Sequence, residues 1–215
     1  SPQIVVGPAL WSSSFLPASY QATSIGNATK SIKAAEIGNL KHPHLSLAEQ
    51  RAQLDMLQSL NSGFSDRRGG EANLEGAIQS FELACRMQSE LPKVMDLSGE
   101  SKSTRDLYGI DKPGTDNFGR QCLLARRMAE AGVRFIEITD QDWDHHGSVS
   151  RLMPMAAKRI DKPISGLLTD LARRGLLDDT LVVWGGEFGR TPDDPTQDGR
   201  GHNNKGYTMW VAGAG

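Results

Sequence analysis

In the first half of the chain, apolar residues recur at helical spacing in two neighbouring segments. The first helix is expected to begin after Ser46, which forms a capping-box pattern with Glu49, and to end at Gly63. The second helix is expected over residues 73–89, and Pro92 is expected to stop it. A short polar segment separates the two patterns, so we predict that these helices pair as a hairpin.

The second half of the chain alternates helical patterns with short apolar runs that are typical of strands. A helix over 117–131 leads into a strand over 133–139, and a helix over 163–175 leads into a strand over 180–184. A further strand is expected over 207–211. Helices that alternate with such strands indicate a parallel sheet covered by helices, and therefore the α/β class.

These patterns divide the chain into a loop-rich and helical-hairpin part over 1–116 and an α/β core part over 117–215. Residues 1–45 are rich in Gly, Pro, Ser and Asn and are expected to form a loop-rich layer. The sequence opens without a methionine and stops at Gly215, directly after a strand-like run. We therefore expect it to be an internal fragment that lacks both ends.

Composition narrows the classes of partner. The 215 residues are 38% hydrophobic and 23% charged with a formal net charge of -2, as in an average soluble globular protein. This balance disfavours nucleic acid or an anionic membrane as the main partner, and no apolar run approaches the roughly 18 residues of a membrane span. Cys85 and Cys122 are interpreted as buried apolar side chains, although a disulfide between them stays an alternative.

Three clusters of polar side chains follow or precede the predicted strands, over 140–147, 185–192 and 199–204. In open α/β sheets, ligands bind at the carboxyl ends of the strands. Hallmark motifs of serine hydrolases, P-loop proteins and dinucleotide-binding proteins are missing from the sequence. The chemistry of this chain is therefore expected in the three clusters.

Candidate metal ligands come from the first and third clusters. The first places three carboxylates and two imidazoles in seven residues, a crowding that a cation would relieve. Asp144 and His146 are two positions apart and point to the same side of an extended segment, which suits zinc, iron or manganese. His202 lies in a loop among hydrogen-bonding residues and is the third candidate. The alternative is a solvated polar loop that Trp143 anchors in the core.

The second cluster supplies candidate catalytic residues. Glu187 follows two glycines that let the backbone approach a ligand, and its carboxylate could bind metal, act as a base or pair with Arg190. Arg190 could bind an oxyanion in a fork, or it could be the partner of Glu187 or Asp193. His42 and His44 lie far upstream and are expected at the surface.

The same clusters carry a family resemblance. The runs WDHHG at 143–147, LLDDTLVVWGGEFGRTP at 176–192 and GRGHN at 199–203 are similar to the bacterial family called domain of unknown function 1501. Weaker matches are FLPA at 15–18, FELACRMQ at 81–88 and GRQCLLARR at 119–127. The resemblance covers nearly the whole chain.

That family in turn resembles the alkaline phosphatase and sulfatase superfamily. The resemblance implies a three-layer α/β/α fold with a mostly parallel sheet, in exported or periplasmic proteins. It also implies a hydrolase of phosphate or sulfate esters, acting on a small-molecule or polysaccharide substrate with a divalent metal ion (zinc, calcium, iron or manganese). Asp144, His146 and His202 look like the superfamily's metal ligands, with Glu187 and Arg190 as the catalytic candidates.

The chain departs from the superfamily pattern at two positions. Phe188 stands where the superfamily commonly has a histidine ligand, and Gly201 stands where the family usually has aspartate. The superfamily's nucleophile and first metal aspartate lie near the start of the complete protein, and no serine or threonine of this chain is nominated in their place. The second hypothesis is therefore a non-catalytic binding or surface protein that retains the fold.

Overall fold

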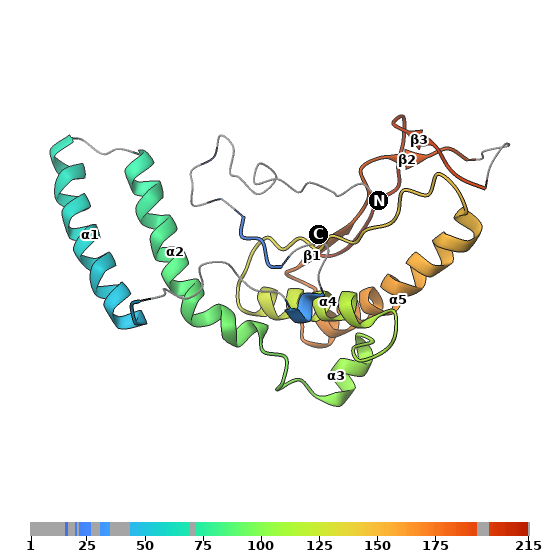
Figure 1. Ribbon diagram of the computed structural model, residues 1–215, viewed down its shortest axis with the longest axis horizontal. Helices are drawn as coiled ribbons and strands as arrows, with labels where there is room; N and C mark the ends of the chain where they lie inside the picture. Colours follow the sequence, from blue (N-terminus) through green and yellow to red (C-terminus); the bar gives the residue numbers. More distant parts are fainter. Residues whose placement is uncertain are drawn as a thin grey trace. The chain divides into compact units, whose positions relative to one another are not determined.

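A computed structural model of the chain describes residues 16, 20, 22–26, 31–34, 44–68, 72–192 and 198–214 (Figure 1). The chain divides into two compact units. The first comprises Ser1–Lys30 with Ala34–Met95, and the second comprises Ser31–Lys33 with Asp96–Gly215. The division thus falls some twenty residues before the boundary that the sequence pattern suggested.

The first unit contains helices α1 (Leu47–Arg68) and α2 (Ala72–Met95), which pack against each other as the predicted hairpin. The expected capping box is present at the start of α1. The Ser46 amide donates to the Glu49 carboxylate at 2.7 Å, and the Glu49 amide donates to the Ser46 hydroxyl at 3.3 Å. An ion pair between Arg51 of α1 and Glu82 of α2, 2.7 Å long, also joins the two helices.

Both helices of the hairpin continue past their predicted ends. Gly63 lies inside α1, which runs to Arg68, and Pro92 lies inside α2, which runs to Met95. A glycine costs a helix only about 1 kcal/mol relative to alanine, so it weakens the helix without stopping it. Pro92 removes one main-chain donor and is followed by only three helical residues.

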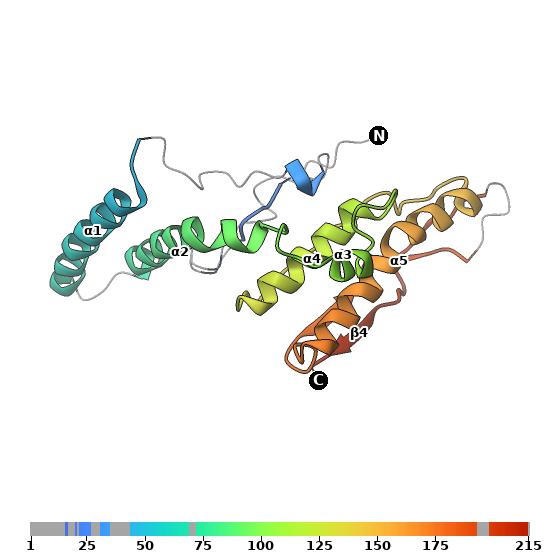
Figure 2. The same cartoon turned by 90° about the horizontal axis from the view of Figure 1, so that it is seen from below.

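The second unit is built on α3 (Lys102–Leu107), α4 (Asp116–Glu130) and α5 (Val149–Arg173). Helices α4 and α5 lie side by side, with α3 against α5 (Figure 2). Their shared core comprises Tyr108, Ile110, Phe118, Cys122, Leu123, Ile160, Leu167 and Leu171. Because two of these core residues follow α3 directly, the segment before α4 belongs to this unit and not to the hairpin.

Helix α4 and the end of α5 agree with the sequence patterns. Gly132 and Gly175 follow the two helices in the left-handed conformation, with φ of 86° and 69°. The start of α5 was predicted wrongly: it begins at Val149 and contains both Pro154 and Pro163. Pro163 is fully buried, so packing of this helix in the core compensates for the hydrogen bond that the proline removes.

Strands β1 (Leu181–Trp184) and β4 (Trp210–Gly213) form a two-stranded sheet. β1 lies where it was predicted, whereas β4 begins three residues later than expected. The two strands pair antiparallel, with Trp184 opposite Trp210, although alternating helices and strands had suggested parallel neighbours. The described residues between the two strands, 185–192 and 198–209, contain no helix, and the chain returns alongside β1 in the opposite direction.

Two short strands, β2 (Gly189–Arg190) and β3 (His202–Asn203), form a second antiparallel pair above this sheet in Figure 1. The segment 133–139, predicted as a strand, pairs with no strand in the described part of the chain. It nevertheless runs towards the first polar cluster, and Ile138 packs against the core.

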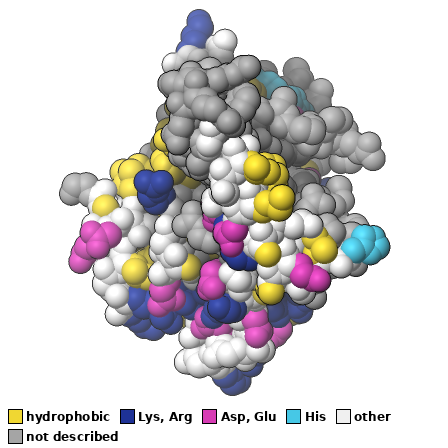
Figure 3. Space-filling model, turned by 90° about the vertical axis from the view of Figure 1, so that its left-hand side faces the viewer, with side chains coloured by type: hydrophobic (Ala, Val, Ile, Leu, Met, Phe, Trp, Pro, Cys, Tyr) yellow, Lys and Arg dark blue, Asp and Glu magenta, His cyan; other side chains and the backbone are white. Residues whose placement is uncertain are grey.

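Helix hydrophobicity, surface charge and the two cysteines can be described from the structure. Across the described residues, no helix has the length and apolar character needed to cross a membrane. Acidic and basic side chains are intermixed on the face seen in Figure 3. Cys85 and Cys122 are both free thiols, and burial together with the Asp140 charge raises the pKa of Cys122 to about 12.

Candidate metal centre

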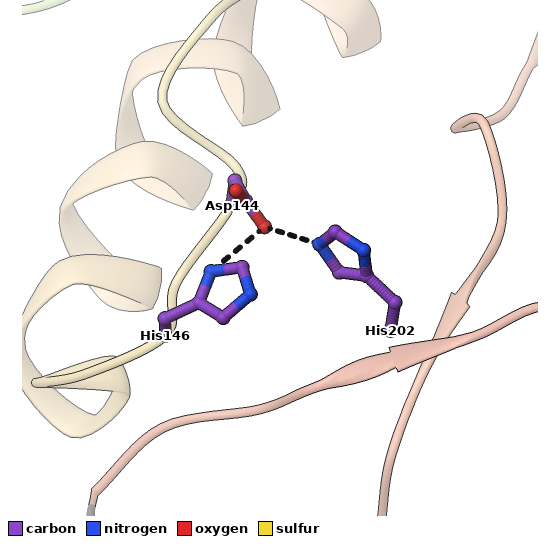
Figure 4. A group of neighbouring side chains, drawn as sticks. All are labelled: Asp144, His146 and His202. Atoms are coloured by element: carbon purple, nitrogen blue, oxygen red, sulfur yellow. Dashed lines mark hydrogen bonds and ion pairs between the residues drawn. The ribbon is translucent and has the colours of Figure 1, made fainter. Parts of the chain in front are cut away.

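Side chains from the first and third polar clusters converge on one point (Figure 4). Oδ1 of Asp144 lies 3.1 Å from Nδ1 of His146 and 3.1 Å from Nε2 of His202. One ligand atom from each of these residues lies within 4.8 Å of the other two. All three side chains are exposed, so the point on which they converge is open to solvent.

The local backbone explains why Asp144 and His146 project together. His145, between them, is buried, whereas its two neighbours are exposed. Alternation of this kind places residues two apart on the same side of an extended segment, as the sequence pattern suggested. The buried residue thus anchors the loop and directs both candidate ligands outward.

Main-chain contacts bring His202 to this loop. The β2–β3 ladder sets His202 opposite Arg190, and the Arg200 amide donates to the His145 carbonyl at 2.9 Å. Gly199 approaches so closely that a Cβ there would lie 2.1 Å from the His146 carbonyl oxygen. A glycine is required at this approach, because any side chain would push the two loops apart.

Arg190 lies beside the three converging side chains. Its guanidinium donates to Oδ1 of Asp144 and, at 3.0 Å, to the Glu187 carboxylate. Burial of Asp144 acts in the opposite direction, but the hydrogen bonds from Arg190 and His202 lower the pKa of this carboxyl below its ordinary value. The Arg190 guanidinium thus shares Oδ1 of Asp144 with the two imidazoles.

Glu187 does not join the converging group. Its carboxylate is exposed and pairs with Arg190, which is the simplest of the three roles considered for it. Asp193, the other candidate partner of Arg190, lies outside the described residues, as does His42. His44 is exposed, as expected.

Trp143 anchors the first loop. Its indole N–H donates to the Asp140 carboxylate at 2.8 Å, and Arg159 of α5 binds the same carboxylate at 2.8 Å. The ring packs against the helical core. An anchored polar loop and a metal-ligand loop are alternatives in the sequence. In the structure, the loop has both an anchored Trp143 and the converging side chains of Asp144 and His146.

Several residues that support the site were not singled out from the sequence. Asp198 accepts from the Ser150 amide and hydroxyl, and so fixes the start of α5 beside the site. Thr191 accepts from the Gly201 amide at 2.9 Å, and its own amide donates to the Gly201 carbonyl. The partners lie 48 and 10 positions apart, beyond the reach of local sequence patterns.

Phe188 packs directly onto the site. Its ring lies 4.4 Å from the His202 ring, centre to centre, and the Arg190 guanidinium lies 5.3 Å above it. Position 188 therefore faces the converging residues. In this chain it supports His202 by packing instead of offering a donor atom.

Two of the three donor-atom separations suit a divalent cation, and the three atoms together lie within 4.8 Å of one another, somewhat wider than the roughly 4.2 Å that two bonds to one ion can span. Two metal–ligand bonds of about 2.1 Å at a tetrahedral angle separate their donor atoms by about 3.4 Å. The 3.1 Å separations from Asp144 to each imidazole are close to that value. One carboxylate and two imidazoles are ligands typical of zinc, manganese and iron sites.

Comparison with known proteins places the chain in a family. The sequence profile of the family described as "Protein of unknown function (DUF1501)" matches residues 2–215, and the chain therefore belongs to this family. No curated protein and no solved structure matches it.

Proposed function

We propose that this chain carries part of the active site of a metal-dependent hydrolase of phosphate or sulfate esters. The observation that carries the proposal is the convergence of Asp144, His146 and His202, whose ligand atoms lie within 4.8 Å of one another. These three side chains would hold a divalent cation, here zinc, manganese, iron or calcium. When bound, such an ion polarises an ester oxygen and activates an oxygen nucleophile.

The chain's own residues have distinct tasks in this proposal. Arg190 lies at the edge of the site, where its planar guanidinium would bind the non-bridging oxygens of a phosphate or sulfate group once it exchanges its contacts with Asp144 and Glu187. Glu187, held by Arg190 at 3.0 Å, is positioned as a proton acceptor near the same place. The openness of the site suits small-molecule and polysaccharide esters alike.

The sheet supports a three-layer α/β/α fold as part of the same proposal. Val182 packs against the helical core on one face of the β1–β4 sheet. The opposite face carries the apolar side chains Leu181, Val183 and Val211, which are 54%, 51% and 64% exposed. A second helical layer over this face would bury them, as in open α/β sheets. Export from the cytoplasm, which the family resemblance suggests, completes the proposal.

A second candidate function is a binding protein that retains the site without catalysis. The observation in its favour is Phe188, which fills the position beside His202 with an apolar ring. Both candidates predict that a divalent cation binds. They differ in whether bound cation leads to turnover.

The test is an ester-hydrolysis assay on the complete natural protein, with 4-nitrophenyl phosphate and 4-nitrophenyl sulfate in the presence of each cation in turn. The hydrolase predicts turnover that a chelator abolishes and that His146→Ala lacks. Asp142→Asn is the matched control, because Asp142 lies in the same loop, is exposed and is outside the converging group. Cation binding without turnover in the folded protein would favour the binding protein.

Arg190→Lys separates binding from catalysis. Lysine keeps the positive charge but loses the fork of donors. The variant is expected to bind the cation as tightly as the parent chain while turnover falls by about tenfold or more. Unchanged turnover would remove Arg190 from the proposed mechanism.

A further inference from the structure

A cavity of about 250 Å³ lies between α5 and the β1–β4 sheet, apart from the metal centre. Its walls include three tryptophan rings, one carboxylate and two aliphatic side chains, from Trp143, Trp184, Trp210, Asp161, Ile160 and Ile164. We propose that this cavity binds a quaternary ammonium group, with the three indole rings around the cation and the Asp161 carboxylate at its side.

The rings are held in place before any ligand arrives. Trp184 and Trp210 are opposite each other in the antiparallel ladder, and their ring planes lie 6° apart with centres separated by 6.3 Å. Trp143 is fixed by its hydrogen bond to Asp140, which Arg159 also holds. A preformed aromatic wall lowers the entropic cost of binding.

The charges around the cavity favour a cation. The face of an aromatic ring is electron-rich, and tryptophan is the strongest of the aromatic side chains in attracting positive charge. The Asp161 side chain is exposed, makes no hydrogen bond or ion pair within the described part of the chain, and lines both this cavity and the neighbouring groove. Arg159 is engaged by Asp140, and Lys162 lines the neighbouring groove beside Asp106.

The scarcity of hydrogen-bonding groups selects among cations. A primary ammonium carries three N–H donors that need acceptors, whereas a quaternary ammonium carries none. Among the described residues that form the cavity wall, Asp161 is the only charged one, and the others are tryptophan and aliphatic side chains. A sugar ring would need several donors and acceptors that these walls lack. The volume lies just below the roughly 300–1,000 Å³ of sites for drug-sized ligands, which suits a small head group.

Two of the tryptophans that line the cavity are adjacent in sequence to the segments that carry the candidate site. Trp143 immediately precedes Asp144, and Trp184 immediately precedes the glycines that lead to Glu187. The cation-binding claim itself stands on the cavity alone and does not need the metal.

The test is a calorimetric titration of the full chain with choline, together with tryptophan fluorescence. The neutral isostere 3,3-dimethyl-1-butanol has the same shape without the charge, and methyl glucoside probes the sugar alternative. Choline is expected to saturate one site per chain and to bind about tenfold tighter than the isostere. Binding is expected to persist in a chelator, which separates this proposal from the metal centre.

Asp161→Asn is the informative variant, because this exposed side chain is unpaired among the described residues and its replacement preserves shape. It is expected to weaken choline binding about tenfold, whereas Asp179→Asn, an exposed carboxylate outside the cavity, leaves it unchanged. Equal binding of choline and its isostere would overturn the proposal. Unchanged binding in Asp161→Asn, or saturation by methyl glucoside but not by choline, would also overturn it.

Discussion

Nε2 of His202 lies 3.1 Å from Oδ1 of Asp144, although 58 positions separate the two residues in the chain. Main-chain pairing produces this proximity: the β2–β3 ladder carries His202, and the Arg200 amide attaches its loop to the His145 carbonyl. The geometry of the candidate metal centre therefore depends on the main-chain contacts between these two loops.

Gly199 provides the first prediction. Replacement by alanine would place a Cβ 2.1 Å from the His146 carbonyl oxygen, so the loops must separate. We expect Gly199→Ala to weaken divalent-cation binding by about tenfold or more, since ligand geometry is lost. Gly147→Ala is the control, because a Cβ at Gly147 meets no atom within 4 Å. Equal affinities of the two variants in a calorimetric titration would contradict this account of the loops.

The second prediction concerns Phe188. An imidazole in place of this ring, which lies 4.4 Å from the His202 ring, would add a nitrogen donor beside the site. Phe188→His is expected to tighten zinc binding by about tenfold or more. Phe188→Leu keeps an apolar side chain and is expected to bring no gain. A histidine variant that binds zinc no better than the leucine variant would show that position 188 cannot supply a ligand.

The third prediction concerns acid stability and rests on Glu100. Its side chain is 8% exposed and binds Arg126 at 2.7 Å and Arg127 at 2.8 Å. Burial raises the pKa of this carboxyl, but the two guanidinium groups outweigh burial and lower the pKa below its ordinary value of 4.5. The stabilisation is therefore present above that value and is lost as pH falls through the lowered pKa of the folded state.

Glu100→Gln is expected to lower the free energy of unfolding by about 2 kcal/mol at neutral pH, because buried Arg126 and half-buried Arg127 each lose a charged contact, while Arg126 keeps its other carboxylate partners. The deficit relative to the parent chain should shrink in urea melts on acidification below the ordinary pKa. Glu137→Gln is the control, since Glu137 is exposed. A deficit that stays constant with pH would show that the carboxylate charge does not contribute.

Val211 tests the three-layer fold. It lies on the apolar face of the β1–β4 sheet with 64% of its surface exposed. If a second helical layer covers this face, Val211→Lys should lower the free energy of unfolding by roughly 2 kcal/mol or more. An uncovered face would tolerate the lysine, and unchanged stability would argue against the second layer.

Sequence patterns predicted the helix ends that depend on interactions between residues close together in the chain. The Ser46–Glu49 capping box and the glycines that follow α4 and α5 are present as expected. Pro92 and Pro163 were expected at helix ends, but both lie inside helices. Whether a proline stops a helix depends on the packing that the rest of the helix gains, which no local pattern contains.

The sequence indicated which residues form the candidate site better than it indicated the hydrogen bonds and ion pairs between them. The two-residue spacing of Asp144 and His146 indicated a shared direction, and both do approach His202. The pairing of Arg190 with Glu187 was one of the alternatives that the sequence offered, whereas the contact of Arg190 with Asp144, 46 positions away, depends on the fold and could not be read from spacing. Strand direction was likewise beyond the pattern, because a strand looks the same whether its neighbour runs parallel or antiparallel.

The most direct test of the central claim is the metal content of the purified chain after loading with zinc, manganese, iron or calcium, measured by elemental analysis. The account predicts about one ion per chain, lost in both Asp144→Ala and His202→Ala and retained in Asp142→Asn. If the folded parent chain binds no ion, or if the two alanine variants retain it, then Asp144, His146 and His202 do not form a metal centre.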